Sequence, residues 1–251
     1  MNPEKKSGLM NRRYSWFVLA IAATLAAVLA AGCAGISPAR GNETAAPPQD
    51  AVPLPQPRLA GDVSVEEALS ARRSVRVYAE VPLTLADAGQ VLWAAQGVTG
   101  DRGYRTAPSA GALYPLEVYL VAGSVMDLEP GVYHYRPGEH LLVRIAGEDV
   151  RTTLQAAAVN QTPIADAPAT VVIAAVPGRT TAKYGERGMR YVFMETGHAA
   201  ENVYLQAEAI NLSTVVIGAF DEDGVREVLA LPENTTPLYL MPVGRPVPGG
   251  D

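Results

Sequence analysis

Cysteine and histidine are scarce in this sequence. Cys33 is the single cysteine, so a disulfide within the chain is impossible. The three histidines are His134, His140 and His198, and none shows metal-ligand spacing with Cys33. We therefore expect neither a disulfide framework nor a metal site.

Several common catalytic motifs are also missing. The sequence contains no G-x-S-x-G, H-E-x-x-H, P-loop or G-x-G-x-x-G motif. Hydrolase, zinc protease, nucleoside triphosphatase and Rossmann assignments therefore lose their main support. The formal net charge is −6, so the chain also lacks the excess of positive charge that neutralises a phosphate backbone. We expect no nucleic-acid partner.

The N-terminal residues have the pattern of an export signal. Four basic residues precede an apolar run over residues 16–31, which matches a signal peptide over residues 1–32. The run is shorter than the ~20 residues of a spanning helix, which disfavours the alternative of a retained transmembrane anchor. The ending L-A-A-G-C resembles a bacterial lipobox, although Ala30 stands where a leucine is usual. We therefore predict a lipidated Cys33 and a membrane-anchored lipoprotein on the periplasmic or extracellular face.

Two export routes remain open. Arg12-Arg13 followed by Tyr14 weakly resembles a twin-arginine signal, and the general secretion route needs only the basic residues themselves. Residues 33–61 are rich in proline and alanine, so we predict an extended linker. A single folded domain should follow over 62–247, with a short tail at 248–251.

The domain alternates helical and strand patterns. Ser64 and Glu67 form a capping box, and Thr84 with Asp87 opens a second helix that should end at Gly97. Further helices are predicted at 148–159, 183–210 and 222–229, and strands at 117–122, 132–136, 140–145, 169–176, 214–217 and 238–243. This mixed order favours an α+β fold with a sheet flanked by helices.

Three short segments stand out as candidate binding elements. Residues 72–76 place three arginines and a serine where the first helix ends, and forked guanidinium donors match phosphate oxygens; a solvated basic turn is the alternative. Residues 107–115 are mostly small, which lets backbone approach a flat ligand, although an ordinary tight loop has the same composition. Residues 216–221 turn from a strand into a helix whose amides can face an electron-rich group, as plain connections also do.

Taken in this order, the three segments resemble the FMN-dependent nitroreductase family, in particular its SagB/ThcOx-type branch, which includes azoline oxidases. Residues 183–191, 197–202 and 244–246 also match. The resemblance covers nearly the whole domain. It implies a nitroreductase-like fold with a central, mostly antiparallel sheet, an FMN cofactor, and a homodimer with two sites across the interface.

The resemblance also implies roles for individual residues. The FMN phosphate and ribityl chain would be held by Arg72, Arg73, Ser74, Arg76 and Arg245. The backbone near flavin N5 would come from Gly218 and Ala219, where the family often has Glu-Gly, and Gln161 would touch the cofactor. The segment that reaches the flavin of the other subunit would comprise Pro108, Ser109, Ala110, Gly111 and Leu113.

Lys183 and Tyr184 match a pair that azoline oxidases use in proton handling. Burial and the charge of a flavin shift the pKa of such groups, which suits them to move the proton that accompanies hydride transfer. The alternative is a surface pair at a helix start. His198 falls within the predicted long helix and is assigned to packing.

The sequence therefore predicts an exported, membrane-anchored FMN oxidoreductase in which a donor and a small-molecule or peptide substrate use the flavin in turn, by ping-pong two-electron transfer. Two alternatives stay open. One is an azoline-type peptide dehydrogenase, which the export signal disfavours because such enzymes work with cytoplasmic cyclisation partners. The other is a flavin-binding or electron-carrier lipoprotein without its own turnover.

Overall fold

The computed structural model describes residues 50–247. The predicted signal peptide, Cys33, most of the linker and the tail at 248–251 lie outside the described residues. Within the described range, a central sheet has seven strands in the order β1-β4-β3-β2-β5-β7-β6. The strands are β1 Ala51–Pro53, β2 Leu116–Ala122, β3 Gly131–Arg136, β4 Leu141–Ala146, β5 Ala169–Ala175, β6 Ser213–Thr214 and β7 Thr236–Gly244.

Every neighbouring pair of strands in this sheet runs antiparallel. Helices cover both of its faces, so the predicted α+β class and central, mostly antiparallel sheet are confirmed. Strand β5, which lies between β2 and β7 inside the sheet, is buried at each of its positions. Val171 and Ile173 face one core, whereas Val172 and Ala174 face the other. This two-sided burial explains why β5 is a continuous apolar run rather than an alternating one.

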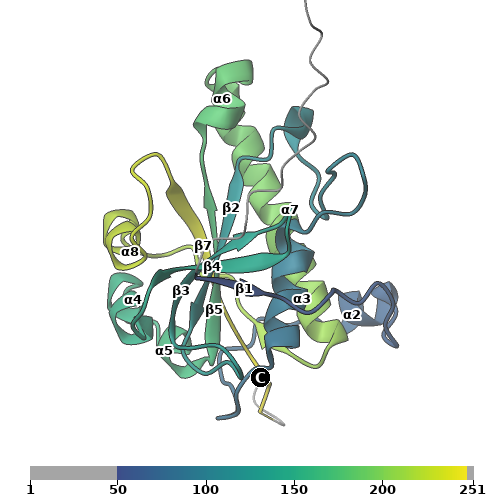
Figure 1. Ribbon diagram of the computed structural model, residues 1–251, viewed down its shortest axis with the longest axis vertical. Coiled ribbons are helices and arrows are strands. Elements are labelled where there is room, and N and C mark those ends of the chain that lie inside the picture. The colour runs from purple at the N-terminus through teal and green to yellow at the C-terminus, as the bar shows by residue number, and fades with distance from the viewer. Residues whose placement is uncertain (1–49, 248–251) are drawn as a thin grey trace, which may run out of the picture. The chain divides into compact units, whose positions relative to one another are not determined.

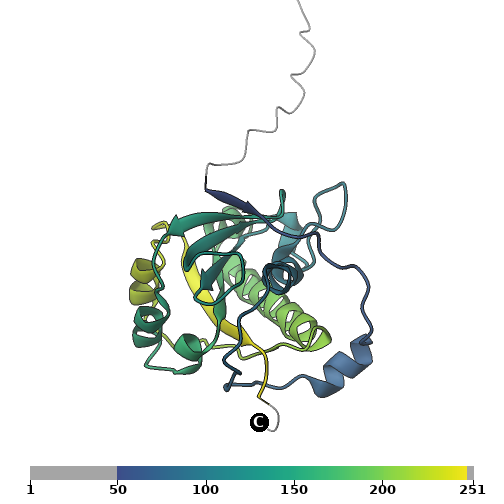
Figure 2. The same ribbon diagram turned by 60° about the horizontal axis from the view of Figure 1, so that its bottom comes forward.

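Two helical layers enclose these cores (Figure 1). On one face lie α3 (Leu85–Gln96) and α7 (Arg187–Ala209), whose buried side chains include Leu92 and Val203. On the other lie α4 (Arg151–Ala157), α5 (Pro163–Asp166) and α8 (Glu222–Val228), which bury Leu154, Ile164 and Val225. Figure 2 shows α2 (Val65–Ala71) beside the C-terminal end of the long α7.

The two predicted helix starts are confirmed. Ser64 accepts a hydrogen bond from the backbone of Glu67, whose side chain accepts one from Ser64 N, and Thr84 forms the same reciprocal pair with Asp87. These bonds satisfy amides that have no partner in the first helical turn. Gly97 caps α3, as expected.

The long helix predicted over 183–210 is wrong at its start. A separate helix, α6 (Gly178–Tyr184), ends at Gly185, and α7 begins only at Arg187. Gly185 has φ 59° and ψ −147°, a conformation that a side chain strongly disfavours. A Cβ on Gly188 would lie 2.8 Å from the Cα of Thr181, so α6 packs closely against the start of α7.

The sheet extends farther toward the N-terminus than the expected start of the domain at residue 62. β1 pairs with β4 from Ala51 to Pro53, and Leu54 is buried in the core. Arg58 exchanges backbone hydrogen bonds with the side chain of Gln90 on α3. Extended, proline-rich chain suits an edge strand, because an edge leaves some N–H groups unpaired. Part of the proline-rich segment thus belongs to the folded unit.

The strand predicted over 214–217 is shorter than expected. Only Ser213 and Thr214 form β6, and Ile217 makes an isolated bridge with Leu240. Across residues 50–247, no helix combines the length and the apolar character needed to cross a membrane.

Candidate functional site

The arginine segment, residues 72–76, leaves the end of α2 and runs onto the sheet. Arg72 is the C-cap of α2. Ser74 forms a parallel bridge with Thr214, and Val75 N donates to Thr214 O at 3.0 Å. Val75 is buried, whereas Arg73, Ser74 and Arg76 are exposed. The fold therefore fixes the backbone of this segment beside β6 and leaves its polar side chains on the surface.

Tyr204 of α7 joins this segment to the residues after β6. Its hydroxyl lies 3.0 Å from Ser74 Oγ and accepts a hydrogen bond from Val216 N at 2.9 Å. The guanidinium of Arg72 stacks over the ring, 5.1 Å from its centroid. A single side chain from α7 thus connects two of the three segments that the sequence singled out. Tyr204 itself was not predicted as a site residue.

The three arginines differ in how many donors remain available. Arg73 Nη1 donates to the carbonyls of Ser70 and Arg72, at 3.0 and 2.8 Å. Arg76 makes one long bond, 3.4 Å, to Ser74 O. Arg72 Nε lies 4.0 Å from Glu201 Oε1, and its side chain is 33% exposed. Arg72 and Arg76 therefore keep most of their donors for a ligand.

The 216–219 turn presents exposed backbone beside the arginine segment. Gly218 and Ala219 are exposed, and among the described residues neither of their N–H groups donates a hydrogen bond. The Gln161 side chain donates to Ala219 O at 2.9 Å and so holds the turn from the α4–α5 connection. Gln161 was expected to touch the cofactor, and that contact stays a prediction. The two exposed amides are available to an acceptor outside the chain.

Arg245 lies close by but is engaged within the chain. Its guanidinium donates to the carbonyls of Ile210 and Asn211, at 3.1 and 3.0 Å, and to Asp87 Oδ2 at 3.1 Å. It therefore caps the end of α7 and ties it to the start of α3. Its expected contact with a phosphate stays a prediction.

The 108–113 loop lies against the predicted proton-handling pair. Gly111 has φ +66°, and a Cβ there would lie 2.7 Å from Tyr184 Oη and 2.9 Å from Lys183 Nζ. The Ser109 hydroxyl accepts a hydrogen bond from Tyr114 N at 2.9 Å. The close backbone approach that small residues predicted here is thus made to Lys183 and Tyr184 of the same chain.

Lys183 and Tyr184 end α6 rather than beginning α7. Lys183 Nζ lies 5.3 Å from the centre of the Tyr184 ring, which meets the Tyr191 ring edge-on at 5.1 Å. Lys183 is exposed and Tyr184 is half-buried. Both groups therefore face the surface beside the 108–113 loop, where a bound molecule can reach them.

The predicted site residues thus form two groups along α7. One comprises the arginine segment, the 216–219 turn and Gln161, around Tyr204; the other comprises the 108–113 loop, Lys183 and Tyr184, around Tyr191. At a rise of about 1.5 Å per residue, Tyr191 and Tyr204 lie about 20 Å apart along the helix. The two tyrosines around which these groups gather are therefore well separated along α7 of one chain.

A buried acid lies between the two groups. Glu195 of α7 is 2% exposed, and its Oε1 has no hydrogen-bond partner within residues 50–247. Burial raises the pKa of Glu195 from 4.5 to about 7, against the opposing effects of the Ser109 hydroxyl and the Arg105 charge. Sequence reasoning missed this residue because its position on the buried face is visible only with the helix in place.

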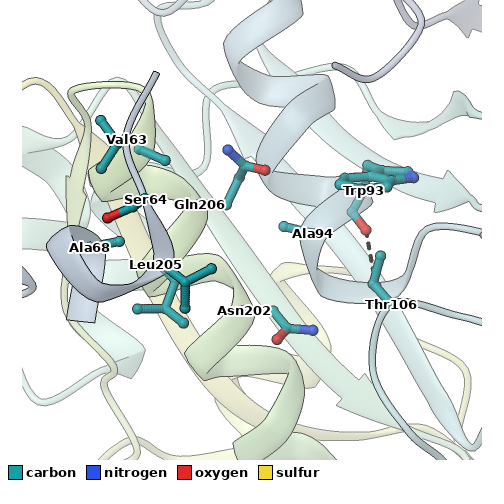
Figure 3. A pocket seen from close by; sticks show the side chains of 11 residues that line it. Val63, Ser64, Ala68, Trp93, Ala94, Thr106, Asn202, Leu205 and Gln206 are labelled. Atoms are coloured by element: carbon teal, nitrogen blue, oxygen red, sulfur yellow. Dashed lines mark hydrogen bonds between the residues drawn. The ribbon is translucent and has the colours of Figure 1, made fainter. Parts of the chain in front are cut away.

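A groove of about 330 Å³ lies between α2, α3 and α7 (Figure 3). Val63, Ala68, Trp93 and Leu205 line it together with Asn202 and Gln206. No acidic or basic side chain lines the groove, so it offers a binding surface rather than a catalytic centre.

Sequence and structure comparisons place this arrangement among known proteins. The profile of the nitroreductase family matches residues 69–245. A Methanocaldococcus jannaschii protein, provisionally named a nitroreductase, is 50% identical over 186 residues, covering 74% of this chain and 93% of that protein. The chain belongs to the nitroreductase family.

Two further similarities agree with this assignment. A Ralstonia eutropha structure, provisionally described as a nitroreductase, matches with a TM-score of 0.70 at 28% identity and covers 79% of this chain and 90% of that one. The Escherichia coli Microcin B17-processing protein McbC is 29% identical over 136 residues, about half of each protein. The predicted nitroreductase family and its SagB-like branch are confirmed, and this nitroreductase-family protein is an oxidoreductase.

Proposed function

We propose that this protein is an FMN-dependent oxidoreductase in which a reductant and a substrate use one flavin in turn. The observation that supports the proposal is the junction at Tyr204, which joins Arg72 and Ser74 of the arginine segment to the 216–219 turn. When bound, the flavin would supply the two-electron chemistry. The protein would supply binding, orientation and hydrogen bonds.

The residues present fit both ends of this cofactor. Arg72 and Arg76 offer forked, charged donors, which suit the oxygens of a phosphate monoester, and Ser74 adds a hydroxyl. The unpaired amides of Gly218 and Ala219 suit an acceptor on the edge of a flat ring. No side chain stands there in place of the family's frequent glutamate, so the ring would be held mainly by backbone.

The two groups along α7 favour a homodimer. The 108–113 loop gathers around Tyr191 and the arginine segment around Tyr204, so in this proposal the loop completes the site of the second copy. Phe193 and Met194 are 55% and 53% exposed on the same helix, and a Cβ on Gly197 would meet nothing within 4 Å. Together with the groove beside α2, this face of α7 suits a second copy of the chain.

Phe193→Asp is expected to weaken self-association, because it puts a charge into the proposed apolar interface. Sedimentation equilibrium at micromolar concentration should show dimers for the parent chain and a shift toward monomers for the variant. Val159→Asp, at another exposed apolar residue, is the matched control and should leave the dimer intact. A parent chain that sediments as a monomer at all concentrations contradicts the homodimer.

Proton handling would belong to Lys183 and Tyr184 of the second copy. General acid–base groups contribute about a hundredfold or more to rate, so Lys183→Ala is expected to slow turnover at least tenfold while flavin occupancy stays near that of the parent. Tyr184→Phe removes the hydroxyl and keeps the ring against Tyr191. Unchanged rates for both variants with every active substrate would assign the pair a structural role.

We also propose that the enzyme is exported and tethered to a membrane by a lipid on Cys33. NAD(P)H is scarce outside the cytoplasm, so the reductant of an exported enzyme would be another electron donor. Small molecules and peptides are both possible substrates, and azoline-type peptide oxidation is the second candidate because McbC is named a microcin-processing protein.

Cys33→Ser is expected to abolish lipidation and leave the fold unchanged, because the thiol is the atom that would carry the diacylglyceryl group and Cys33 precedes the described residues 50–247. Metabolic labelling with a fatty acid measures the lipid, and circular dichroism of the purified variant serves as the control for folding. A parent chain that takes up no label contradicts the lipobox assignment.

Anaerobic stopped-flow reduction with a panel of donors, followed by mixing with candidate acceptors, tests the proposed activity. We expect complete reduction by at least one donor and multiple turnovers with at least one acceptor. Reduction and reoxidation without turnover of any small molecule or peptide would identify an electron carrier and overturn the catalytic proposal.

A further inference from the structure

A polar cavity of about 370 Å³ is lined by no residue of either group described above. Its walls come from the end of α3, the start of β2, the β3–β4 turn and α6. Its lining includes the charged and amide residues Gln96, Arg105, Glu117, Arg136, Glu139 and Arg179, together with Tyr135, whose hydroxyl is hydrogen-bonded to His140. Its volume is within the range of small-molecule sites.

Both polar atoms of the Gln96 side-chain amide are buried without a hydrogen-bond partner among the described residues. The residue is 1% exposed, and its Nε2 and Oε1 have no hydrogen-bond partner anywhere in residues 50–247. Buried amides are almost always paired, because an unpaired buried polar group costs about 1–3 kcal/mol. A molecule in the cavity that both donates and accepts would satisfy Gln96.

Arg105 adds an unpaired donor to the same cavity. Its Nε has no partner in the described part of the chain, and its Nη1 makes only a 3.4 Å bond to Gln96 O. The guanidinium stacks over Tyr114, 5.0 Å from the ring centre, which holds it in place. A carboxylate placed between Arg105 and Gln96 would accept from both.

The charges around the cavity favour an anion. Three arginines line it against two glutamates, and Glu117 already forms an ion pair with Arg179 and lies within hydrogen-bond distance of His134, whose Nε2 is 2.6 Å from Glu117 Oε2. Glu139 is exposed at the rim, as is Arg136. An ammonium group would therefore meet surplus positive charge, whereas a hydroxyl can donate to Gln96 Oε1 without that cost.

We propose that this cavity binds a small 2-hydroxycarboxylate. Its carboxylate accepts from Arg105 Nε and Gln96 Nε2, and its hydroxyl donates to Gln96 Oε1. This binding does not depend on the proposed flavin chemistry, so it stands or falls separately.

Isothermal titration of the purified chain with lactate tests the site, whether or not the chain carries a flavin. A dissociation constant on the order of 1 mM is expected for so small a ligand. Propionate, which lacks the hydroxyl, and lactamide, which lacks the charge, should each bind about tenfold more weakly or not at all. These two analogues separate the roles of Gln96 and Arg105 without altering the protein.

Three variants locate the binding. Gln96→Leu and Arg105→Gln should each weaken lactate binding tenfold or more, and Arg136→Gln, at the exposed rim where folding is not at risk, should weaken it several-fold. Arg102→Gln, an arginine that does not line the cavity, is the control and should change nothing. A cavity that holds only water, with no lactate binding at 50 mM, about fifty times the expected constant, would overturn the proposal. Equal binding by the parent and Arg136→Gln, or lactamide binding as tightly as lactate, would also overturn it.

Discussion

Arg72→Gln is expected to weaken FMN binding by roughly ten- to a hundredfold. A hydrogen bond to a charged group contributes about 1.5–3 kcal/mol, and about 1.4 kcal/mol changes a dissociation constant tenfold. Arg72 is suited to this role because its side chain is 33% exposed and its nearest carboxylate, Glu201, lies 4.0 Å away. Adding Arg76→Gln should weaken binding further.

Riboflavin provides the control for this experiment, because it lacks only the phosphate. Its affinity should change much less than that of FMN when the apo-protein is titrated with both flavins. Arg102→Gln removes the same charge from the 98–105 loop and should leave both affinities unchanged. Equal losses for FMN and riboflavin in Arg72→Gln would show that the arginine segment does not hold the phosphate.

Glu195→Gln is expected to stabilise the fold above pH 7 and to have little effect near pH 4. In the unfolded chain this carboxyl titrates near 4.5, whereas burial raises its pKa in the fold to about 7. The folded state therefore binds more protons between these values, so the parent loses stability as the pH rises from about 4.5 to about 7. Above pH 7 the cost of ionising Glu195 is on the order of 2–3 kcal/mol, at about 1.36 kcal/mol per pKa unit and allowing for relaxation.

Thermal melts between pH 4 and pH 9 measure this effect. At pH 8 the variant should melt roughly 5–10 °C above the parent, and the two curves should converge at low pH. Glu201→Gln removes an exposed carboxylate from the same helix and should shift the melt by much less. A constant difference between Glu195→Gln and the parent at all pH values would show that Glu195 does not titrate in the fold near neutral pH.

The fold was largely predictable from local signals. The capping pairs at Ser64 and Thr84 depend on residues only three positions apart. The burial of β5 follows from its continuous apolar composition. The break between α6 and α7 at Gly185 was not predicted, because a single glycine next to a helical pattern is also compatible with an uninterrupted helix. The backbone conformation of Gly185 and the close packing of Gly188 on Thr181 become visible only in the folded chain.

The candidate site was predictable in its segments but not in its assembly. The arginine segment and the 216–219 turn carry recognisable residues, whereas Tyr204, which joins them, lies in a helix where tyrosine has no special signature. The unpaired amide of Gln96 and the burial of Glu195 arise from residues distant in sequence. Such features depend on tertiary packing, which no local pattern encodes.

The chromophore of the purified protein tests the central claim most directly. The account predicts that the chain carries a non-covalent flavin, that mass spectrometry of the released molecule identifies FMN, and that apo-protein takes up one FMN per chain. A purified chain that holds no flavin and whose apo-form binds no FMN at micromolar concentration, or one that carries a different chromophore in its place, would contradict it.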